Sequence, residues 1–190
     1  MAPRYALARR LARNLLQEGK IGRPPVPVER LAAQCGATIR YEPFDGELSG
    51  MMYCQSGRSA IIGVNSEDTA VRQRFTIAHE IGHLFLHKGE DVYIDEKPSS
   101  KFLRPKEMVR LRDSVSGQAT DPREIEANQF AAELLMPQDF IFKSVEDLDP
   151  EISVDEAIEK LSHLFQVSSI AMTYRLTNLK ILSSADEVAG

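Results

Sequence analysis

The hydrophobic pattern of the N-terminal part changes from the period of a helix to that of strands. Residues 4–18 carry apolar side chains at every fourth position, namely Leu7, Leu11 and Leu15. This spacing predicts an amphipathic helix. A second, shorter helix is expected over residues 28–35, and Gly36 marks its end before a strand at residues 37–41.

Two further apolar runs, residues 48–54 and 59–65, are joined by a short polar link that contains Gly57. Such a link between apolar runs is typical of a β-hairpin. We therefore expect a small, mainly antiparallel sheet built from residues 37–65. Ser59–Asn65 is the candidate edge strand of this sheet.

The second half of the chain is predominantly helical. A long helix is expected from the polar residues 66–68 to about residue 87. Another helix begins at Asp121-Pro122, because proline is favoured in the first helical turn, and ends near Pro137. Two more helices are expected, at residues 152–165 and 170–179.

The segment between the two long helices, residues 88–122, is interrupted by proline and glycine. Short strands are expected within it, at residues 92–94 and 108–113. Its basic side chains are Lys97, Lys101, Arg104, Lys106, Arg110 and Arg112. A connection of this length in a small domain is usually functional or mobile, and we expect it to restrict access to a site between the helices.

Together these elements predict an α+β fold, in which a small sheet packs on a pair of long helices. The 190 residues suffice for one well-buried core. We expect residues 1–145 to form the main domain, including the N-terminal helices. Residues 146–190 are expected to form a small helical subdomain, whose spacing resembles a helix-turn-helix.

Charge modifies the interpretation of this tail. The chain has a net charge of −5; residues 1–40 carry eight Lys or Arg against two acids, whereas residues 133–190 carry four against eleven. The last predicted helix offers only Arg175 and Lys180 as basic residues, while a DNA-reading helix needs several. Nucleic-acid binding is therefore disfavoured, and packing or docking of a partner is the preferred role of the tail.

The cellular compartment is inferred from cysteine content and hydropathy. Cys35 and Cys54 are too few for a disulfide framework. No apolar run approaches the roughly 20 residues that span a bilayer. We expect a cytoplasmic protein that does not bind membranes.

The strongest chemical signal is the sequence His79-Glu80-Ile81-Gly82-His83. On a helix, side chains four residues apart share one face at about 6 Å, so His79 and His83 can bind one metal ion. Glu80 follows directly and can act as a general base toward the attacking water of a zinc-dependent hydrolysis. Gly82 weakens a helix, which indicates that another backbone or the metal cluster passes close to it.

A third ligand is needed, and the helix after Asp121 offers Glu124 and Glu126. These two side chains point about 160° apart around a helix, so only one of them can face the metal. Glu124 shares its face with Asn128, four residues later. This pair would combine a ligand with a polar residue that orients a ligating histidine.

The residues RQRFTIAHEIGHLFLH (72–87) and EIEANQFAAELLMP (124–137) together resemble the ImmA/IrrE family of metallopeptidases. The segments PPVPVERLAAQCGATIRYEPF (24–44) and GMMY…AIIGVN (50–65) are also similar to that family. The resemblance covers most of the chain. It implies a zincin-like enzyme with one zinc ion.

The resemblance further implies that His79, His83 and Glu124 are the metal ligands, because Glu124 precedes Ala127 by three residues. Asn128 stands where the family has an acidic or amide residue. Family members are implied to cleave or inactivate helix-turn-helix repressors, which switches on the repressed genes. Some members carry an additional domain before or after the peptidase, and we expect none here beyond the C-terminal helices.

Several other side chains are weaker candidates. His87 continues the row of histidines, but one zinc ion does not easily reach all three. A role as a cation at the helix C-terminus or as a hydrogen-bonding residue is preferred. His163 is expected to be structural. Candidates for binding the substrate carbonyl are Tyr53, Tyr93, Arg110 and Arg112.

Two other classes of protein remain possible from the sequence. One is a DNA-binding regulator that uses its C-terminal helices, and the other is a non-catalytic regulatory protein on a zincin-like scaffold. For an active peptidase, we expect a strand of the sheet to pair with the substrate backbone, and Ser59–Asn65 is the candidate.

Overall fold

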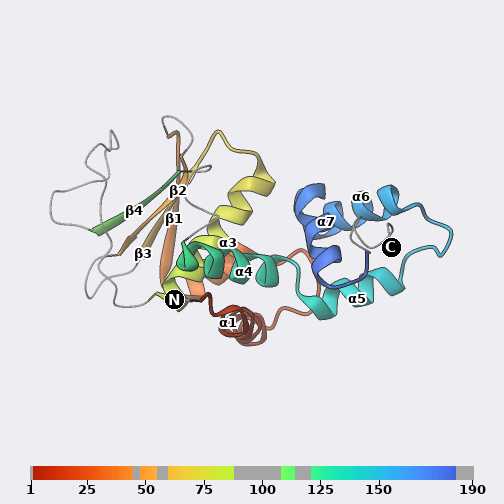
Figure 1. The fold of residues 1–190 in the computed structure, drawn as a ribbon. Helices are drawn as coiled ribbons and strands as arrows, with labels where there is room; N and C mark the ends of the chain where they lie inside the picture. Colours follow the sequence, from red (N-terminus) through yellow and green to blue (C-terminus); the bar gives the residue numbers. More distant parts are fainter. Residues whose placement is uncertain (1, 45–47, 55–59, 88–107, 114–120, 183–190) are drawn as a thin grey trace.

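The computed structural model describes residues 2–44, 48–54, 60–87, 108–113 and 121–182. In chain order the elements are α1 (Tyr5–Glu18), α2 (Val28–Gln34), β1 (Ala37–Glu42), β2 (Leu48–Cys54), β3 (Ala60–Asn65), α3 (Ala70–Leu86), β4 (Met108–Asp113), α4 (Pro122–Leu135), α5 (Gln138–Glu146), α6 (Val154–Phe165) and α7 (Ser169–Asn178). Figure 1 shows the sheet at one end, α3 and α4 in the middle and α5 to α7 at the other end. The α+β class is confirmed.

The strands form one sheet in the order β1-β3-β2-β4. The expected hairpin is present, because β2 and β3 pair antiparallel, with Met52 opposite Ile62. β4 also pairs antiparallel with β2, so the strand expected at residues 108–113 is confirmed. β1 runs parallel to β3, with Ala37 opposite Ala60. The sheet is thus mainly antiparallel with one parallel pair.

The expectation that Ser59–Asn65 forms an edge strand is wrong. β3 lies between β1 and β2 and pairs with both, so its backbone is already used within the sheet. Five of its six residues are buried, and Ile61 is the one that is partly exposed. A nearly continuous apolar run of this kind is typical of a strand covered on both faces. The described edges of the sheet are β1 and β4.

The connection between α3 and α4 is described only in part. β4 belongs to it, whereas the strand expected at residues 92–94 and the basic side chains of the segment lie outside the described residues. Within the described ranges, no helix is long and apolar enough to cross a membrane.

Local signals in the sequence explain most helix boundaries. Asp121 caps α4 by accepting a hydrogen bond from the backbone N–H of Arg123, and proline follows it as expected. Ser153 and Glu156 form a reciprocal capping box at the start of α6. The helix α5 was not expected. Pro137 ends α4 but is also the residue from which α5 starts, with Ile141 buried.

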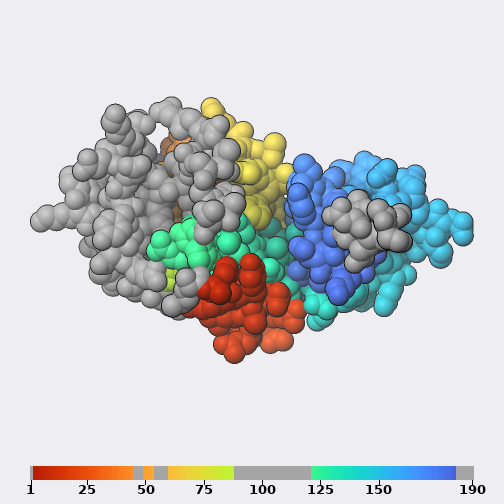
Figure 2. Space-filling view, viewed as in Figure 1, coloured from red at the N-terminus to blue at the C-terminus, as the bar shows by residue number. Residues whose placement is uncertain are grey.

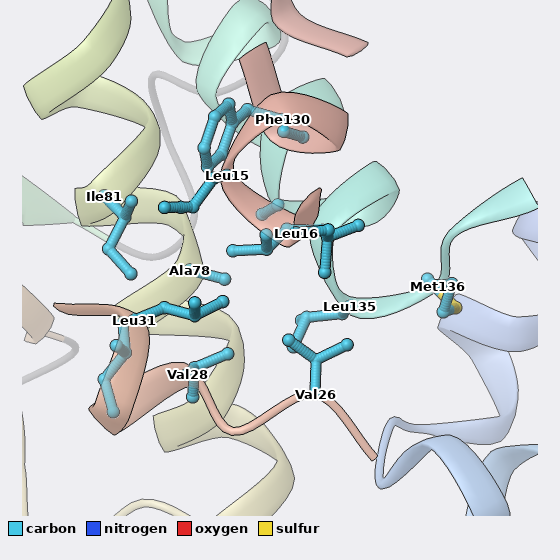
Figure 3. Close-up of a cluster of buried hydrophobic side chains, with 14 of the residues drawn as sticks. Leu15, Leu16, Val26, Val28, Leu31, Ala78, Ile81, Phe130, Leu135 and Met136 are labelled. Carbon is cyan, nitrogen blue, oxygen red and sulfur yellow. The ribbon is translucent and has the colours of Figure 1, made fainter. Parts of the chain in front are cut away.

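The core is continuous across the molecule. One cluster of buried apolar side chains includes Ala12 of α1, Ile81 of α3, Phe130 of α4, Ile141 of α5 and Met172 of α7. Figure 3 shows the part of this cluster where α1, α3 and α4 meet. The C-terminal helices therefore share the hydrophobic core with the helices that carry the histidine motif.

Two glycines allow α3 to lie close to its neighbours. A Cβ atom on Gly50 of β2 would stand 2.2 Å from the Thr76 Cγ2 atom, so the sheet and α3 are in tight contact. A Cβ atom on Gly82 would stand 3.2 Å from Phe130 Cβ and 3.3 Å from Ala127 Cα. The expectation of a neighbouring backbone at Gly82 is thereby confirmed: that backbone is α4.

Buried arginines connect the C-terminal helices to the rest of the molecule. Arg74 of α3 donates hydrogen bonds to the carbonyl oxygens of Val26 and Gln166, at 2.9 and 3.3 Å. Arg175 of α7 donates to the Met136 carbonyl oxygen at 2.9 Å and forms an ion pair with Glu133 of α4. Burial lowers the pKa of Arg74 from its ordinary value, because desolvation disfavours its charged form.

We predict that Gly82→Val weakens both the fold and metal binding. The larger side chain must push α4 away from α3, and overpacking of this kind costs about 1–3 kcal/mol of the free energy of unfolding. Urea unfolding and a zinc titration measure the two effects. Gly22→Val is the matched control, because no atom lies within 4 Å of a Cβ built there. Equal stability losses in the two variants would contradict the assigned role of Gly82.

Candidate metal centre

The residues of the histidine motif lie in the buried middle of α3. His79 is 4% exposed and His83 is 1% exposed, and they are one helical turn apart. Glu124 lies in the first turn of α4, directly after the Asp121 cap and Pro122. Because Gly82 lets α4 pack closely against α3, the carboxylate is brought to the face that carries both imidazoles.

Three side-chain atoms converge at this point. The Nε2 atoms of His79 and His83 are 3.2 Å apart. The Oε2 atom of Glu124 lies 3.4 Å from His79 Nε2 and 3.8 Å from His83 Nε2. Among the described residues, these three side chains form the one cluster with the spacing of a metal site.

The dimensions and the chemistry of the cluster fit zinc. Ligand atoms about 2.0–2.1 Å from a tetrahedral zinc ion are roughly 3.3 Å from one another. The three measured separations, 3.2, 3.4 and 3.8 Å, lie close to this value. Two imidazole nitrogens and one carboxylate oxygen also form a donor set that zinc accepts while keeping a fourth position open. The cluster could hold one such ion with little rearrangement.

Glu80 is a buried carboxyl group next to this cluster. It follows His79 directly on α3 and is 1% exposed. It is not one of the three residues whose donor atoms converge. A carboxylate beside a metal site, but outside its ligand set, is available to accept a proton from an attacking water.

The alternative ligand Glu126 is engaged elsewhere. Its carboxylate forms an ion pair with Arg4, with 2.7 Å between Arg4 Nη2 and Glu126 Oε2, and accepts a second hydrogen bond from the Arg4 backbone N–H at 2.7 Å. The hydrogen bonds from Arg4 lower the pKa of Glu126 to about 2. Glu126 therefore stays ionised at neutral pH, bound to the N-terminus of α1 rather than to the cluster.

His87 caps the C-terminal end of α3 and joins Glu126 to the histidine row. Its Nδ1 atom lies 2.8 Å from His83 Nδ1, and its Nε2 atom lies 3.1 Å from Glu126 Oε2. Both of its nitrogens thus face partners other than the three convergent atoms. This geometry matches the hydrogen-bonding role expected from the sequence.

Asn128 shares a face of α4 with Glu124 but lies further along the helix. It lines a cavity with Phe75 and Tyr174, and its Oδ1 atom is buried without a hydrogen-bond partner among the described residues. That Asn128 orients a ligating histidine stays a prediction.

The weaker candidates are placed as follows. The Tyr53 hydroxyl is buried, whereas Tyr93 and the side chains of Arg110 and Arg112 lie outside the described part of the chain. The side chain of His163 is 80% exposed and lies 3.9 Å from Glu159, so it is a surface residue of α6. Sequence reasoning missed Arg4, because its partner Glu126 is 122 positions away and no local pattern connects them.

A helix with two histidines four residues apart, together with a carboxylate from a second helix, is the arrangement found in metallopeptidases of the zincin type. Comparison with protein families agrees. The family described as the IrrE N-terminal-like domain, a peptidase family, matches residues 32–177. The chain belongs to this family.

Two curated relatives extend the comparison. The radiation response metalloprotease IrrE of Deinococcus radiodurans is 30% identical over 118 residues, which are 62% of this chain and 30% of IrrE. The chain therefore spans less than a third of the length of that relative. The uncharacterized immunity region protein 2 of Bacillus phage phi105 is 24% identical over 169 residues, 87% of this chain and 93% of the phage protein.

We predict that Glu124→Gln lowers the zinc content of the purified protein sharply, because it removes the charged ligand from the cluster. Glu126→Gln should leave most of the zinc bound, since its carboxylate faces Arg4 and His87. Zinc per chain after gel filtration, measured by atomic emission, separates the two variants. Retention by Glu124→Gln and loss by Glu126→Gln would reverse the assignment of the third ligand.

Proposed function

We propose that this protein is a zinc-dependent endopeptidase that cuts a helix-turn-helix transcriptional repressor and thereby relieves repression. The observation that carries the proposal is the convergence of His79, His83 and Glu124 next to the buried Glu80. The membership in a peptidase family supports the reaction class.

The chemistry is divided between the ion and the chain. Zinc, when bound, supplies a Lewis acid that polarises the scissile carbonyl and lowers the pKa of the attacking water. Glu80 takes the proton from that water and passes it to the leaving amine. His79, His83 and Glu124 hold the ion in place. Burial of the centre keeps the local dielectric low, which strengthens these electrostatic effects.

A groove beside the metal centre would receive the substrate. A cavity of about 640 Å³ lies between the first turns of α3 and the helix α7, and Figure 2 shows the corresponding notch between these two parts. Phe75 lines this cavity, and its ring centroid is 5.9 Å from that of His79. Ile170 and Tyr174 form its outer wall and are 72% and 69% exposed. An apolar groove whose wall contains Phe75, the neighbour of His79, suits a segment of a protein substrate.

The relatives support a regulatory substrate rather than a nutrient protein. One is described as a radiation response metalloprotease and the other as a phage immunity region protein. We infer that the substrate is a repressor and that the enzyme acts in the cytoplasm, where such a repressor works.

A DNA-binding role for the C-terminal helices is less well supported. Of the two basic residues on the last helix and its end, Arg175 is buried and paired with Glu133. Its guanidinium is therefore turned into the core, away from any phosphate. A reader of DNA would need exposed basic side chains at this position.

We predict that Glu80→Gln keeps its zinc and loses cleavage by about 10²–10⁴-fold, because an amide cannot accept the proton while the ligands are untouched. The purified chain is incubated with a candidate repressor, with and without a chelator, and the fragments are located by mass spectrometry. Glu159→Gln, an exposed change on α6, is the control. Full turnover by Glu80→Gln would exclude its role as the base, and full turnover in chelator would exclude the metal.

We also predict one preferred cut in a folded repressor and little digestion of an unfolded protein such as casein. The groove and the long segment at residues 88–122 are the features expected to restrict entry. Rapid cleavage of casein at many sites would contradict this.

Two groove variants refine the same experiment. Ile170→Ala and Tyr174→Ala should raise the KM for the repressor while leaving cleavage of a short peptide spanning the cut site unchanged. The side chain of His163 is exposed on α6, outside the groove, so His163→Ala serves as the control. An unchanged KM for the repressor in both groove variants would exclude the groove as the binding site.

A further inference from the structure

A chain of hydrogen bonds, buried from His83 to Glu126 and partly buried at Arg4, leads away from the metal centre through the second nitrogen of His83. It starts at the Nδ1 atom of His83, which lies 2.8 Å from His87 Nδ1. It continues from His87 Nε2 to Glu126 Oε2 at 3.1 Å. It ends at Arg4, whose Nη2 lies 2.7 Å from the same carboxylate oxygen.

The hydrogen-bonding capacity of each group fixes where the protons lie. An ionised carboxylate can only accept, so the proton between His87 and Glu126 belongs to His87 Nε2. In the neutral ring, His87 Nδ1 is then an acceptor, and His83 Nδ1 must be the donor. His83 therefore carries its proton on Nδ1 and presents the lone pair of Nε2.

That lone pair faces the metal site. His83 Nε2 is the atom that lies 3.2 Å from His79 Nε2 and 3.8 Å from Glu124 Oε2. We propose that His87, Glu126 and Arg4 are positioning residues: their hydrogen-bond chain holds His83 in the tautomer and ring orientation that bind the metal through Nε2. The proposal rests on the metal site proposed above.

The arrangement is more specific than a general contribution to packing. His87 and Glu126 are both buried, and both nitrogens of His87 are used. Arg4 holds the carboxylate with its guanidinium and with its backbone N–H, and its guanidinium also donates to the Leu86 carbonyl oxygen at 3.2 Å. Glu126 is thus fixed from two directions, so its accepting oxygen is presented to His87 in one geometry.

Loss of such an outer partner usually costs about 10–100-fold in metal affinity. His87→Leu removes the hydrogen bond between His83 Nδ1 and His87 Nδ1, so the chain that holds the His83 ring in this tautomer is broken. We expect its zinc Kd to rise within that range. Glu126→Gln keeps an oxygen that can accept from His87, so a smaller rise is expected.

Zinc affinity is measured by competition with a chromophoric chelator at neutral pH. His163→Leu is the matched control, because the His163 side chain is exposed on the surface of α6. A Kd for His87→Leu within twofold of the wild-type value would overturn the proposal. Failure of the wild-type chain to bind zinc would overturn the proposed function as well, which distinguishes the two.

Side-chain ¹H–¹⁵N correlation spectra of the wild-type protein test the tautomers directly and do not depend on a variant that folds. We expect a single proton on Nε2 of His87 and a single proton on Nδ1 of His83, with zinc bound. A proton on Nδ1 of His87 would overturn the proposal, because that nitrogen could then not accept from His83.

Discussion

The close packing of α3 against α4 is the constraint on which the candidate site depends. Two histidines four residues apart place two nitrogen atoms on one face of a helix. A third donor atom within the same distance of both nitrogens has to come from a different element. The carboxylate of Glu124 has to come from another helix, and it reaches His79 Nε2 at 3.4 Å because Gly82 carries no side chain where Ala127 and Phe130 pass. A helix-weakening residue is thus located where α4 passes close to α3, next to the candidate site.

The same packing gives two neighbouring acidic residues different tasks. Glu124 and Glu126 are two positions apart, so their side chains leave α4 in nearly opposite directions. Glu124 joins the histidine nitrogens, while Glu126 is held by Arg4 and His87. One helix therefore presents Glu124 to the histidine nitrogens on one face and Glu126 to His87 on the other.

The C-terminal helices are connected to this centre through buried charges as well as through the common core. Glu133 of α4 forms ion pairs with Arg13 of α1 and Arg175 of α7, so one carboxylate connects three helices. A buried charge that loses its partner is strongly destabilising, which makes separation of these helices costly. Phe75 of α3, Met136 and Tyr174 of α7 line the groove between these parts of the molecule.

Much of the fold and of the site was available from the sequence because its signals are local. The helical period of α1, the cap at Asp121 and the four-residue spacing of His79 and His83 each depend on a few neighbouring residues. The hairpin of β2 and β3 followed from the short polar link between two apolar runs. The helix α5 was not predicted from the sequence, because Pro137 was interpreted only as the end of the preceding helix. In the structure the same proline is also the N-cap residue of α5.

The sequence by itself therefore determined the class of fold, the motif helix and the pair of acidic residues that are candidates for the third ligand. The family resemblance already implies that Glu124 faces the histidines, and the tertiary structure places it there. Only the tertiary structure decided that β3 is central in the sheet and that Arg4 holds Glu126. The physical reason is distance along the chain. The partners of β3 and of Glu126 are determined by how whole elements pack against one another. Residues that meet in this way, such as Arg4 and Glu126, are far apart in the sequence, and no local pattern predicts their contact.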